Sequence, residues 1–299
     1  MNNKGIRRLL EFTLRLARKA RIPLFSCKFS RRDFTQHQHL ALLVLKQYMV
    51  ADYRKACHVA EELKSCSEVL KLARIPHFTT LQKFFDRMKS AWLDRLFSQI
   101  FARFRSIRYL ALDSTGMLAG HCSHYFVSRI DRKLQVSNFP KLSVMLDVKR
   151  RLPATAVCHV LPRHDSRDFQ PLMKRVRQKA DYFVADKAYE CKMIVEVLKE
   201  MNITPIIPLK FGKNPVKATW RKRLLRKWIS HPHIQRQYNQ RSLIESFFSA
   251  LKRRLGEGVA SRRWQLQRRE AVLKVLVYSI MQRSEVLFLI GFLQSLVRE

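Results

Sequence analysis

The stretch Ile107-Arg-Tyr-Leu-Ala-Leu-Asp113 marks the point at which the pattern of the chain changes from helical to extended. Ile107–Leu112 is a short apolar run that predicts a buried strand, with Asp113 where this strand is expected to end. Further along, the apolar run Tyr182–Ala185 has the same form and is followed at once by Asp186. Side chains at the carboxyl ends of neighbouring parallel strands emerge at one edge of a sheet. If the two strands are neighbours, the two aspartates are therefore expected to converge.

The segments around these strands predict an α/β architecture. Apolar, β-rich runs at Leu142–Val148 and Ala154–Leu161 are joined by a short basic connection typical of a hairpin. The chain then alternates between helix and strand, with helices at 169–179 and 191–201, strands at 182–185 and 203–209, and a last helix that carries Glu245. The order strand, strand, strand, helix, strand, helix, strand, helix predicts an RNase H-like mixed sheet flanked by helices over residues 106–262.

Residues 1–105 are predicted to be helical throughout. Arg7–Arg21 is amphipathic, His39–Val50 is strongly apolar, and Asp52 can cap a helix that runs to Leu63. Helices of this kind pack their apolar faces together, so we expect a separate all-helical N-terminal region. A C-terminal helical segment is expected over residues 263–299.

The end of the N-terminal region has a second possible meaning. A short helix at Ser67–Ala73 is followed by a turn and by a long helix over Thr79–Arg105, whose first threonines are candidate N-caps. This arrangement, with Lys83 and Arg87 on the second helix, resembles a helix-turn-helix reader of DNA. A plain helical bundle with a basic surface fits the same pattern equally well.

The charge of the chain indicates a polyanionic partner. Its 299 residues carry a formal net charge of +36, and such self-repulsion disfavours a compact state unless a polyanion such as nucleic acid relieves it. The six cysteines form no Cys-x-x-Cys pair, which argues against a zinc knuckle. No run of 18 apolar residues exists, so no transmembrane helix and no membrane partner are expected.

The helix that carries Glu245 is predicted to begin at Tyr238 and to continue to Lys252. Because steps of four and seven residues return near the same side of a helix, Tyr238, Arg241, Glu245 and Lys252 are expected to share one polar face. A carboxylate flanked by two cations and a phenol can bind a metal ion and a phosphate together. The simpler interpretation is a surface salt bridge between Arg241 and Glu245, worth about 0.2–0.5 kcal/mol.

Asp113, Asp186 and Glu245 are the candidate metal ligands. Three hard oxygen ligands with open positions suit Mg²⁺ or Mn²⁺, and two such ions can drive an in-line phosphoryl displacement. Each aspartate also has a simpler interpretation, as the start of a turn or as part of a surface ion pair. Three other aspartates are rival ligands: Asp147, Asp165 and Asp168.

Two basic clusters bracket the helix that carries Glu245. The one before it contains seven Lys or Arg residues and no acid, with Arg221 and Arg223 near its centre and Trp220 and Trp228 interleaved. We expect this surface to follow a DNA backbone, because phosphate neutralisation dominates sequence-independent affinity. The tryptophans could stack on an unpaired base, or could equally anchor the segment to the core.

Together, these motifs resemble the acidic-triad (DDE) transposases of insertion sequences, and more narrowly the group with a Tyr-Arg-Glu-Lys signature. The likeness covers about residues 107–281 and depends on the following motifs: Asp113-Ser-Thr-Gly, His164-Asp-Ser, Ala185-Asp-Lys-Ala-Tyr189, Tyr238-x2-Arg241-x3-Glu245-x6-Lys252 and Ser249-Ala-Leu-Lys252.

The resemblance implies a metal-dependent enzyme. Asp113, Asp186 and Glu245 would hold the two Mg²⁺ or Mn²⁺ ions, and Tyr238, Arg241 and Lys252 would grip the phosphates of a transposon end. It also implies cleavage at terminal inverted repeats, transfer of the freed 3′-hydroxyl into target DNA, a homodimer on DNA, and a cytoplasmic, nucleoid-associated protein of a prokaryote. A non-catalytic DNA-binding protein derived from a transposase and an RNase H-like nuclease are the alternatives.

Overall fold

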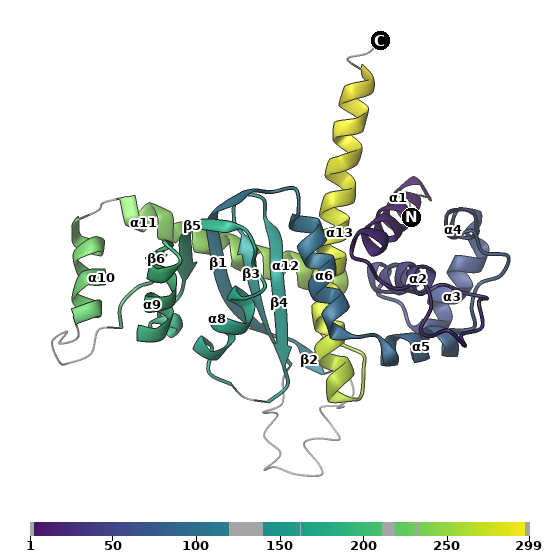
Figure 1. Ribbon diagram of the computed structural model, residues 1–299, viewed down its shortest axis with the longest axis horizontal. Coiled ribbons are helices and arrows are strands. Elements are labelled where there is room, and N and C mark those ends of the chain that lie inside the picture. The colour runs from purple at the N-terminus through teal and green to yellow at the C-terminus, as the bar shows by residue number, and fades with distance from the viewer. Residues whose placement is uncertain (1–2, 120–139, 162, 211–218, 231–232, 297–299) are drawn as a thin grey trace.

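The computed structural model describes residues 3–119, 140–161, 163–210, 219–230 and 233–296. Within these ranges, the side chains of 223, 227, 229 and 285–296 are not described. A central sheet lies between a group of N-terminal helices and a smaller group of helices formed by residues 192–238 (Figure 1).

The central sheet has five strands in the order β4-β3-β1-β5-β6. Their bounds are β1 Ser106–Gly116, β3 Lys141–Asp147, β4 Leu152–His159, β5 Lys179–Ala185 and β6 Thr204–Ile206. β3 pairs antiparallel with both β1 and β4, whereas β5 pairs parallel with both β1 and β6. This mixed order, with helices on its faces, confirms the predicted RNase H-like fold.

Strand β1 is longer than the sequence pattern predicted. β1 continues through Asp113 to Gly116, whereas we predicted that it would end at Asp113. The extra length comes from pairing with β3, which joins Asp113 to Val144 and Gly116 to Lys141. A two-stranded sheet of β2 (Leu118–Ala119) and β7 (Gly258–Val259) lies beside this end of β1.

The N-terminal region is helical, as predicted. Its helices are α1 Asn3–Lys19, α2 Gln36–Tyr48, α3 Tyr53–Glu62, α4 Lys64–Leu70, α5 Phe78–Arg87 and α6 Ser90–Phe101. α1 is amphipathic and packs against α2, in which eleven of thirteen residues are buried. Thr35 and Gln38 form a capping box at the start of α2, and the Asp52 side chain caps α3 as predicted.

The predicted long helix over Thr79–Arg105 is two helices. Met88 and Lys89 are extended, and Met88 is buried at 1% exposure, so burial of this side chain accompanies a bend between α5 and α6. The N-cap of α5 is His77 rather than either threonine. The short helix predicted at Ser67–Ala73 begins three residues earlier, as α4.

The remaining helices pack around the sheet. They are α8 Ser166–Met173, α9 Lys192–Glu200, α10 Thr219–Ser230, α11 His233–Tyr238, α12 Ser242–Leu255 and α13 Trp264–Leu296, with short 3₁₀ turns η1 Lys187–Tyr189 and η2 Asn239–Arg241. α13 contacts β4 and α6 as well as α1 and α2, so it joins the sheet to the N-terminal helices (Figure 1). One buried hydrophobic cluster includes residues of α8, α9, α12 and α13, of the central sheet and of the N-terminal helices, and Trp228 of α10 and Tyr238 of α11 pack against it.

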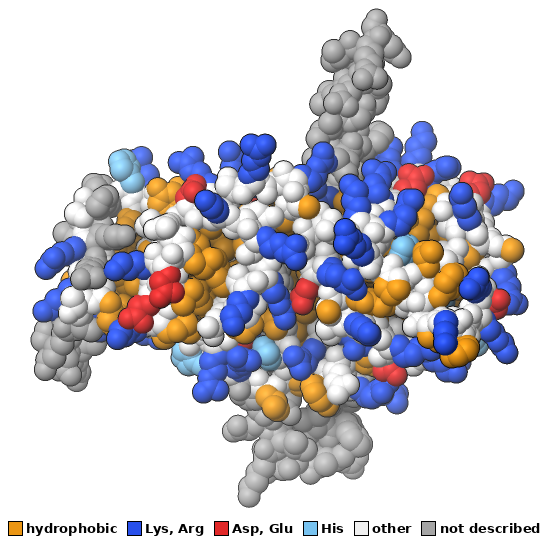
Figure 2. All heavy atoms as spheres, in the orientation of Figure 1, with side chains coloured by type: hydrophobic (Ala, Val, Ile, Leu, Met, Phe, Trp, Pro, Cys, Tyr) orange, Lys and Arg blue, Asp and Glu red, His pale blue; other side chains and the backbone are white. Residues whose placement is uncertain are grey.

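Two surface properties follow from the composition. Lys and Arg side chains are spread over the face shown in Figure 2, with hydrophobic patches between them, and acidic side chains on this face are few. No helix within the described ranges combines the length and apolar content that crossing a membrane would require.

Candidate catalytic site at the edge of the sheet

The parallel pairing of β1 with β5 brings the two predicted aspartates together. Leu112 pairs with Ala185, and each is followed by an aspartate, so Asp113 and Asp186 occupy adjacent positions. β5 ends at Ala185, whereas β1 continues, so Asp113 lies inside a strand and Asp186 begins the turn η1. The convergence that the sequence predicted is therefore present, although the two side chains leave the backbone from different local structures.

Backbone N–H groups orient both carboxylates. Asp113 Oδ1 accepts a hydrogen bond from the Ser114 N–H at 2.8 Å. Asp186 Oδ1 accepts one from the Ala188 N–H at 2.7 Å, as the side-chain cap of η1. Each aspartate thus has one oxygen fixed by its own chain, and its second oxygen is available for another contact.

Arg241 connects the first of these aspartates to Glu245. Its Nη1 donates to Asp113 Oδ2 at 3.0 Å, and its Nη2 donates to Glu245 Oε1. The Arg241 and Asp113 side chains are 22% and 17% exposed, whereas that of Glu245 is 54% exposed. The sequence allowed the simpler interpretation that Arg241 and Glu245 form an isolated surface salt bridge. The pair is not isolated, because the same guanidinium also contacts Asp113 of β1.

Neighbouring charges act on Asp113. Burial raises the pKa of its carboxyl above the ordinary value of 3.8, and the charges of Asp186 and Glu245 raise it further. The Ser114 N–H and the Arg241 guanidinium oppose this rise in pKa. Burial lowers the pKa of Arg241, but Asp113 and Glu245 outweigh it and raise that pKa overall. The three acids and Arg241 thus form one electrostatic unit.

α12 presents Glu245 from a firmly anchored helix. Ile244, Phe247 and Leu251 are buried in the core, and the Phe247 ring meets Tyr278 of α13 edge-on at 5.2 Å. At the other end, Lys274 Nζ donates to the carbonyls of Leu255 and Gly256, at 2.5 and 2.9 Å. Burial lowers the pKa of Lys274 to about 8.

The predicted continuous helix from Tyr238 to Lys252 was wrong in one respect. α11 ends at Tyr238, the turn η2 follows, and α12 begins at Ser242. The Tyr238 ring packs edge-on against Trp228, with centroids 5.6 Å apart, and Trp228 Nε1 donates to the Ile207 carbonyl. This matches the interpretation of Trp228 as a core anchor.

The other predicted DNA contacts lie in different parts of the structure. Lys252 is on α12, two turns after Glu245, and Lys83 and Arg87 are exposed on α5. Arg221 Nε contacts Glu190 Oε1 at 2.5 Å, and Arg221 also donates to the Lys210 carbonyl. The side chain of Arg223 lies outside the described residues.

The rival aspartates belong to separate interactions. Asp147 is fully buried at the end of β3, where it binds Arg150. Asp165 Oδ1 accepts a hydrogen bond from Ser114 Oγ at 2.9 Å and also contacts Lys141. The sequence analysis did not foresee this link between Ser114 and Asp165, because nothing in the local pattern relates residues 51 positions apart.

The donor types suit a hard divalent cation, but the arrangement in this conformation holds a guanidinium. Carboxylate oxygens are what Mg²⁺ and Mn²⁺ prefer. Among the described residues, no group of three or more His, Cys, Asp or Glu side chains is gathered closely enough to hold a metal ion. Arg241 contacts both Asp113 and Glu245, where it offsets negative charge that a metal ion would otherwise balance.

Comparison with known proteins places this site in a family. The solved structures that match include a piggyBac transposase synaptic complex with hairpin DNA, with 11% identity and a TM-score of 0.47, covering 94% of this chain and 73% of that one. None of the curated proteins matches. Residues 105–280, which contain Asp113, Asp186 and Glu245, match the family described as Transposase DDE domain. This match spans more than half of the sequence, and the chain therefore belongs to the DDE transposase domain family.

Proposed function

We propose that this protein is a transposase that cleaves DNA at the inverted-repeat ends of a mobile element and joins the freed 3′-hydroxyl to target DNA. The observation that carries the proposal is the adjacency of Asp113 and Asp186, with Glu245 linked to the same position through Arg241. These are three carboxylates from three separate elements. In a chain with a net charge of +36, such a local concentration of acids is unusual and suits a metal-dependent reaction.

Asp113, Asp186 and Glu245 are proposed to hold two Mg²⁺ or Mn²⁺ ions. When bound, such ions activate the attacking oxygen and stabilise the leaving oxygen of a phosphodiester. The contribution of the chain is to set the positions of the carboxylates. Ser114 and Ala188 N–H groups orient the two aspartates, and α12 supplies Glu245 from a packed helix.

Arg241, Tyr238 and Lys252 are proposed to bind phosphates of the DNA end. The planar guanidinium of Arg241 already makes a forked contact with two carboxylates, and the same geometry suits two phosphate oxygens. Lys252 lies two turns further along α12 and offers a point charge. The phenol of Tyr238 can donate a hydrogen bond to phosphate.

The proposed reaction is two successive phosphoryl transfers. In the first, a water oxygen bonds to phosphorus at the element end, and the bond from phosphorus to the 3′-oxygen breaks, which leaves a 3′-hydroxyl. In the second, this hydroxyl oxygen bonds to a phosphorus of the target strand as a 3′-oxygen of that strand departs with the proton. The first step hydrolyses one phosphodiester bond. In the second step one phosphodiester bond is made for the one that is broken, so joining needs no external energy source.

The DNA contacts extend beyond the catalytic site. We propose that residues 1–105 bind the element end, with Lys83 and Arg87 of α5 among the contacts, and that Arg221 and Arg223 lie along the DNA track. A homodimer on paired ends, in a nucleoid-associated cytoplasmic location, follows from the same proposal.

The experiment uses DNA that carries the inverted repeats flanking the gene, incubated with the protein and Mg²⁺. Wild-type protein is expected to give nicked ends and then joined products. Asp186→Asn should lower cleavage by at least about a thousandfold, because it removes one charge at the reacting centre. Asp181→Asn is the matched control, because Asp181 is exposed on the same strand β5, five residues before Asp186.

Each alternative has its own outcome. Nicked DNA without joined products would indicate an RNase H-like nuclease. Tight, salt-sensitive binding without metal-dependent nicking would indicate a DNA-binding protein that has lost catalysis. Full activity of Asp186→Asn would remove this residue from the site.

A further inference from the structure

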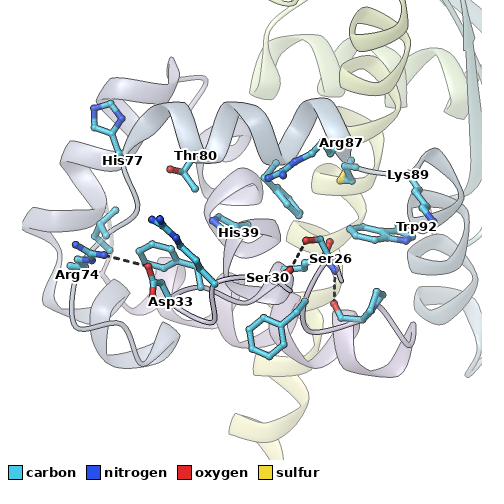
Figure 3. Close-up of a pocket in the computed structure, with 18 of the residues that line it drawn as sticks. Ser26, Ser30, Asp33, His39, Arg74, His77, Thr80, Arg87, Lys89 and Trp92 are labelled. Atoms are coloured by element: carbon cyan, nitrogen blue, oxygen red, sulfur yellow. Dashed lines mark hydrogen bonds and ion pairs between the residues drawn. The ribbon is translucent and has the colours of Figure 1, made fainter. Parts of the chain in front are cut away.

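A large cavity lies in the N-terminal helices. Its volume is about 1050 Å³, and none of its lining residues belongs to the sheet or to α12. The walls come from the segment between α1 and α2, from α2, from one residue of α3, from the segment between α4 and α5, and from α5 and the first half of α6 (Figure 3). The cavity is large enough to take a ligand of the size of a nucleotide or larger.

Aromatic rings follow one another along this cavity. The ring centroids of Phe34 and His39 are 5.6 Å apart, those of His39 and Phe84 are 5.1 Å apart, and those of Phe84 and Trp92 are 6.3 Å apart. We call these four residues the aromatic ladder. Figure 3 shows His39 near the middle of the cavity, with Trp92 at one end and Arg74 at the other. Of these rings, that of Phe34 is partly exposed and can offer a face to a planar ligand, whereas His39, Phe84 and Trp92 are at most 8% exposed.

Positive charge dominates the lining. Five Lys or Arg side chains and two acidic side chains contribute to it: Arg31, Arg74, Arg87, Lys89 and Arg95, with Asp33 and Glu61. Asp33 already pairs with Arg74, at 3.5 Å. Arg87 and Lys89 are exposed at the rim, where they can reach an anion in solvent. A ligand with negative charge is therefore favoured over a neutral or cationic one.

His39 adds a polar group without a partner. Its side chain lines the cavity and is 8% exposed, and its Nε2 has no hydrogen-bond partner among the described residues. Burial, reinforced by the charge of Arg87, lowers the pKa of His39 to about 4, so its imidazole is neutral near pH 7. A buried nitrogen without a hydrogen-bond partner destabilises the fold, and here it lies next to a cavity from which a ligand could supply that partner.

We propose that this cavity binds an unpaired nucleotide of a DNA strand. The base would lie against the aromatic ladder, within reach of the His39 ring, and the phosphate would lie among the arginines and Lys89. Cations alone would suit any polyanion, such as an acidic peptide, but the ladder selects a ligand with a planar ring. The inference rests on the proposed function only in taking DNA as the ligand.

The test measures the affinity of full-length protein for two labelled duplexes, one blunt and one with a short single-stranded overhang, by fluorescence anisotropy. Wild-type protein is expected to prefer the overhang about tenfold, the size expected for stacking one base on aromatic side chains. His39→Phe should reduce this preference several-fold, because it removes the hydrogen bond between the base and the His39 ring nitrogen while stacking remains. It keeps a ring in the ladder and removes the unsatisfied nitrogen, so its thermal stability should equal or exceed that of the wild type.

Arg87→Gln provides a second variant at the exposed rim, and it keeps the test valid if His39→Phe does not fold. Lys83→Gln is the matched control, because Lys83 lies one turn earlier on α5 and does not line the cavity. Arg87→Gln should weaken binding of the overhang more than that of the blunt duplex, whereas Lys83→Gln should weaken both equally.

Two results would overturn the inference: equal affinity of the wild type for both duplexes, or an overhang preference that is unchanged in both cavity variants. Displacement of the overhang by polyglutamate as readily as by a single-stranded oligonucleotide would overturn the choice of a nucleotide. Failure of the proposed function is a separate result, because it appears as absent metal-dependent cleavage whatever the overhang preference.

Discussion

Two acidic clusters lie near the same end of the sheet and differ in how their charge is balanced. In the candidate catalytic site, Asp113 and Glu245 share the guanidinium of Arg241, Asp186 lies beside Asp113, and Glu245 remains 54% exposed. In the second cluster, Asp168 of α8 is fully buried and faces several cations and donors. Ser143 Oγ donates to it at 2.7 Å, its ion-pair contacts are with Lys141 and Arg163 at 3.6 and 3.3 Å, and His159 Nε2 lies 3.2 Å from it.

This difference separates an acid that stabilises the fold from acids available for chemistry. A buried carboxylate surrounded by cations is already compensated and has little capacity for a further ligand. Carboxylates that outnumber the cation in contact with them retain negative charge, which favours binding of a divalent ion. The comparison predicts opposite responses when one acid is removed from each cluster.

The largest effect on stability is expected for Asp168→Ala. It leaves Lys141 and Arg163 partly buried without their shared acid, so the free energy of unfolding should fall by about 3–5 kcal/mol. Chemical denaturation measures this change. Asp168→Asn is the control, because it keeps the volume and a hydrogen-bond acceptor for Ser143, and it should cost less. A neutral effect of Asp168→Ala would show that the second cluster does not stabilise the fold.

Asp113→Asn should raise the free energy of unfolding, in contrast to Asp168→Ala. Because burial and the neighbouring acids raise the pKa of Asp113 above 3.8, the folded state binds this proton more tightly than the unfolded state does. Stability is therefore lost as the pH rises from 3.8 through the raised pKa, and ionised Asp113 destabilises the fold at neutral pH. The Arg241 guanidinium lowers the pKa of Asp113, but the pKa remains raised overall.

At pH 7 Asp113→Asn should raise the free energy of unfolding by about 0.5–2 kcal/mol, the usual gain when a destabilising residue of a functional site is replaced. Cleavage of DNA should be lost in the same variant. The gain should shrink as the pH is lowered and vanish below the ordinary carboxyl pKa of 3.8. Thermal unfolding at a series of pH values measures it. A variant that is less stable than the wild type at pH 7 would contradict the comparison.

The sequence predicted the arrangement of the candidate catalytic site better than that of the second cluster, for a physical reason. Asp113 and Asp186 each follow an apolar run, and parallel pairing of two such runs places them side by side. Arg241 and Glu245 are four residues apart, which helical geometry relates directly. The contact between Arg241 and Asp113 joins residues 128 positions apart and depends on how α12 packs, which no local pattern encodes.

The errors at element ends have similar causes. β1 is longer than its apolar run because pairing with β3 satisfies the backbone groups of the polar residues after Asp113. The break at Met88 replaces a predicted helical residue with an extended one whose side chain is buried. In both cases tertiary contacts outweighed the local propensity of the chain.

The smallest predicted effect tests whether the two clusters act independently. Ser114 Oγ donates to Asp165, which also contacts Lys141 of the second cluster, whereas the backbone N–H of Ser114 donates to Asp113. Ser114→Ala removes the first contact and keeps the second. The free energy of unfolding should fall by about 1 kcal/mol, the usual contribution of one hydrogen bond.

Cleavage by Ser114→Ala should stay within a few-fold of the wild type, because the N–H that orients Asp113 belongs to the backbone and survives the substitution. Denaturation and cleavage assays on the same preparation measure both quantities. A loss of cleavage as large as that expected for Asp186→Asn, without a matching loss of stability, would mean that the buried cluster positions Asp113 through Ser114. The second cluster would then be part of the catalytic apparatus rather than a separate element that stabilises the fold.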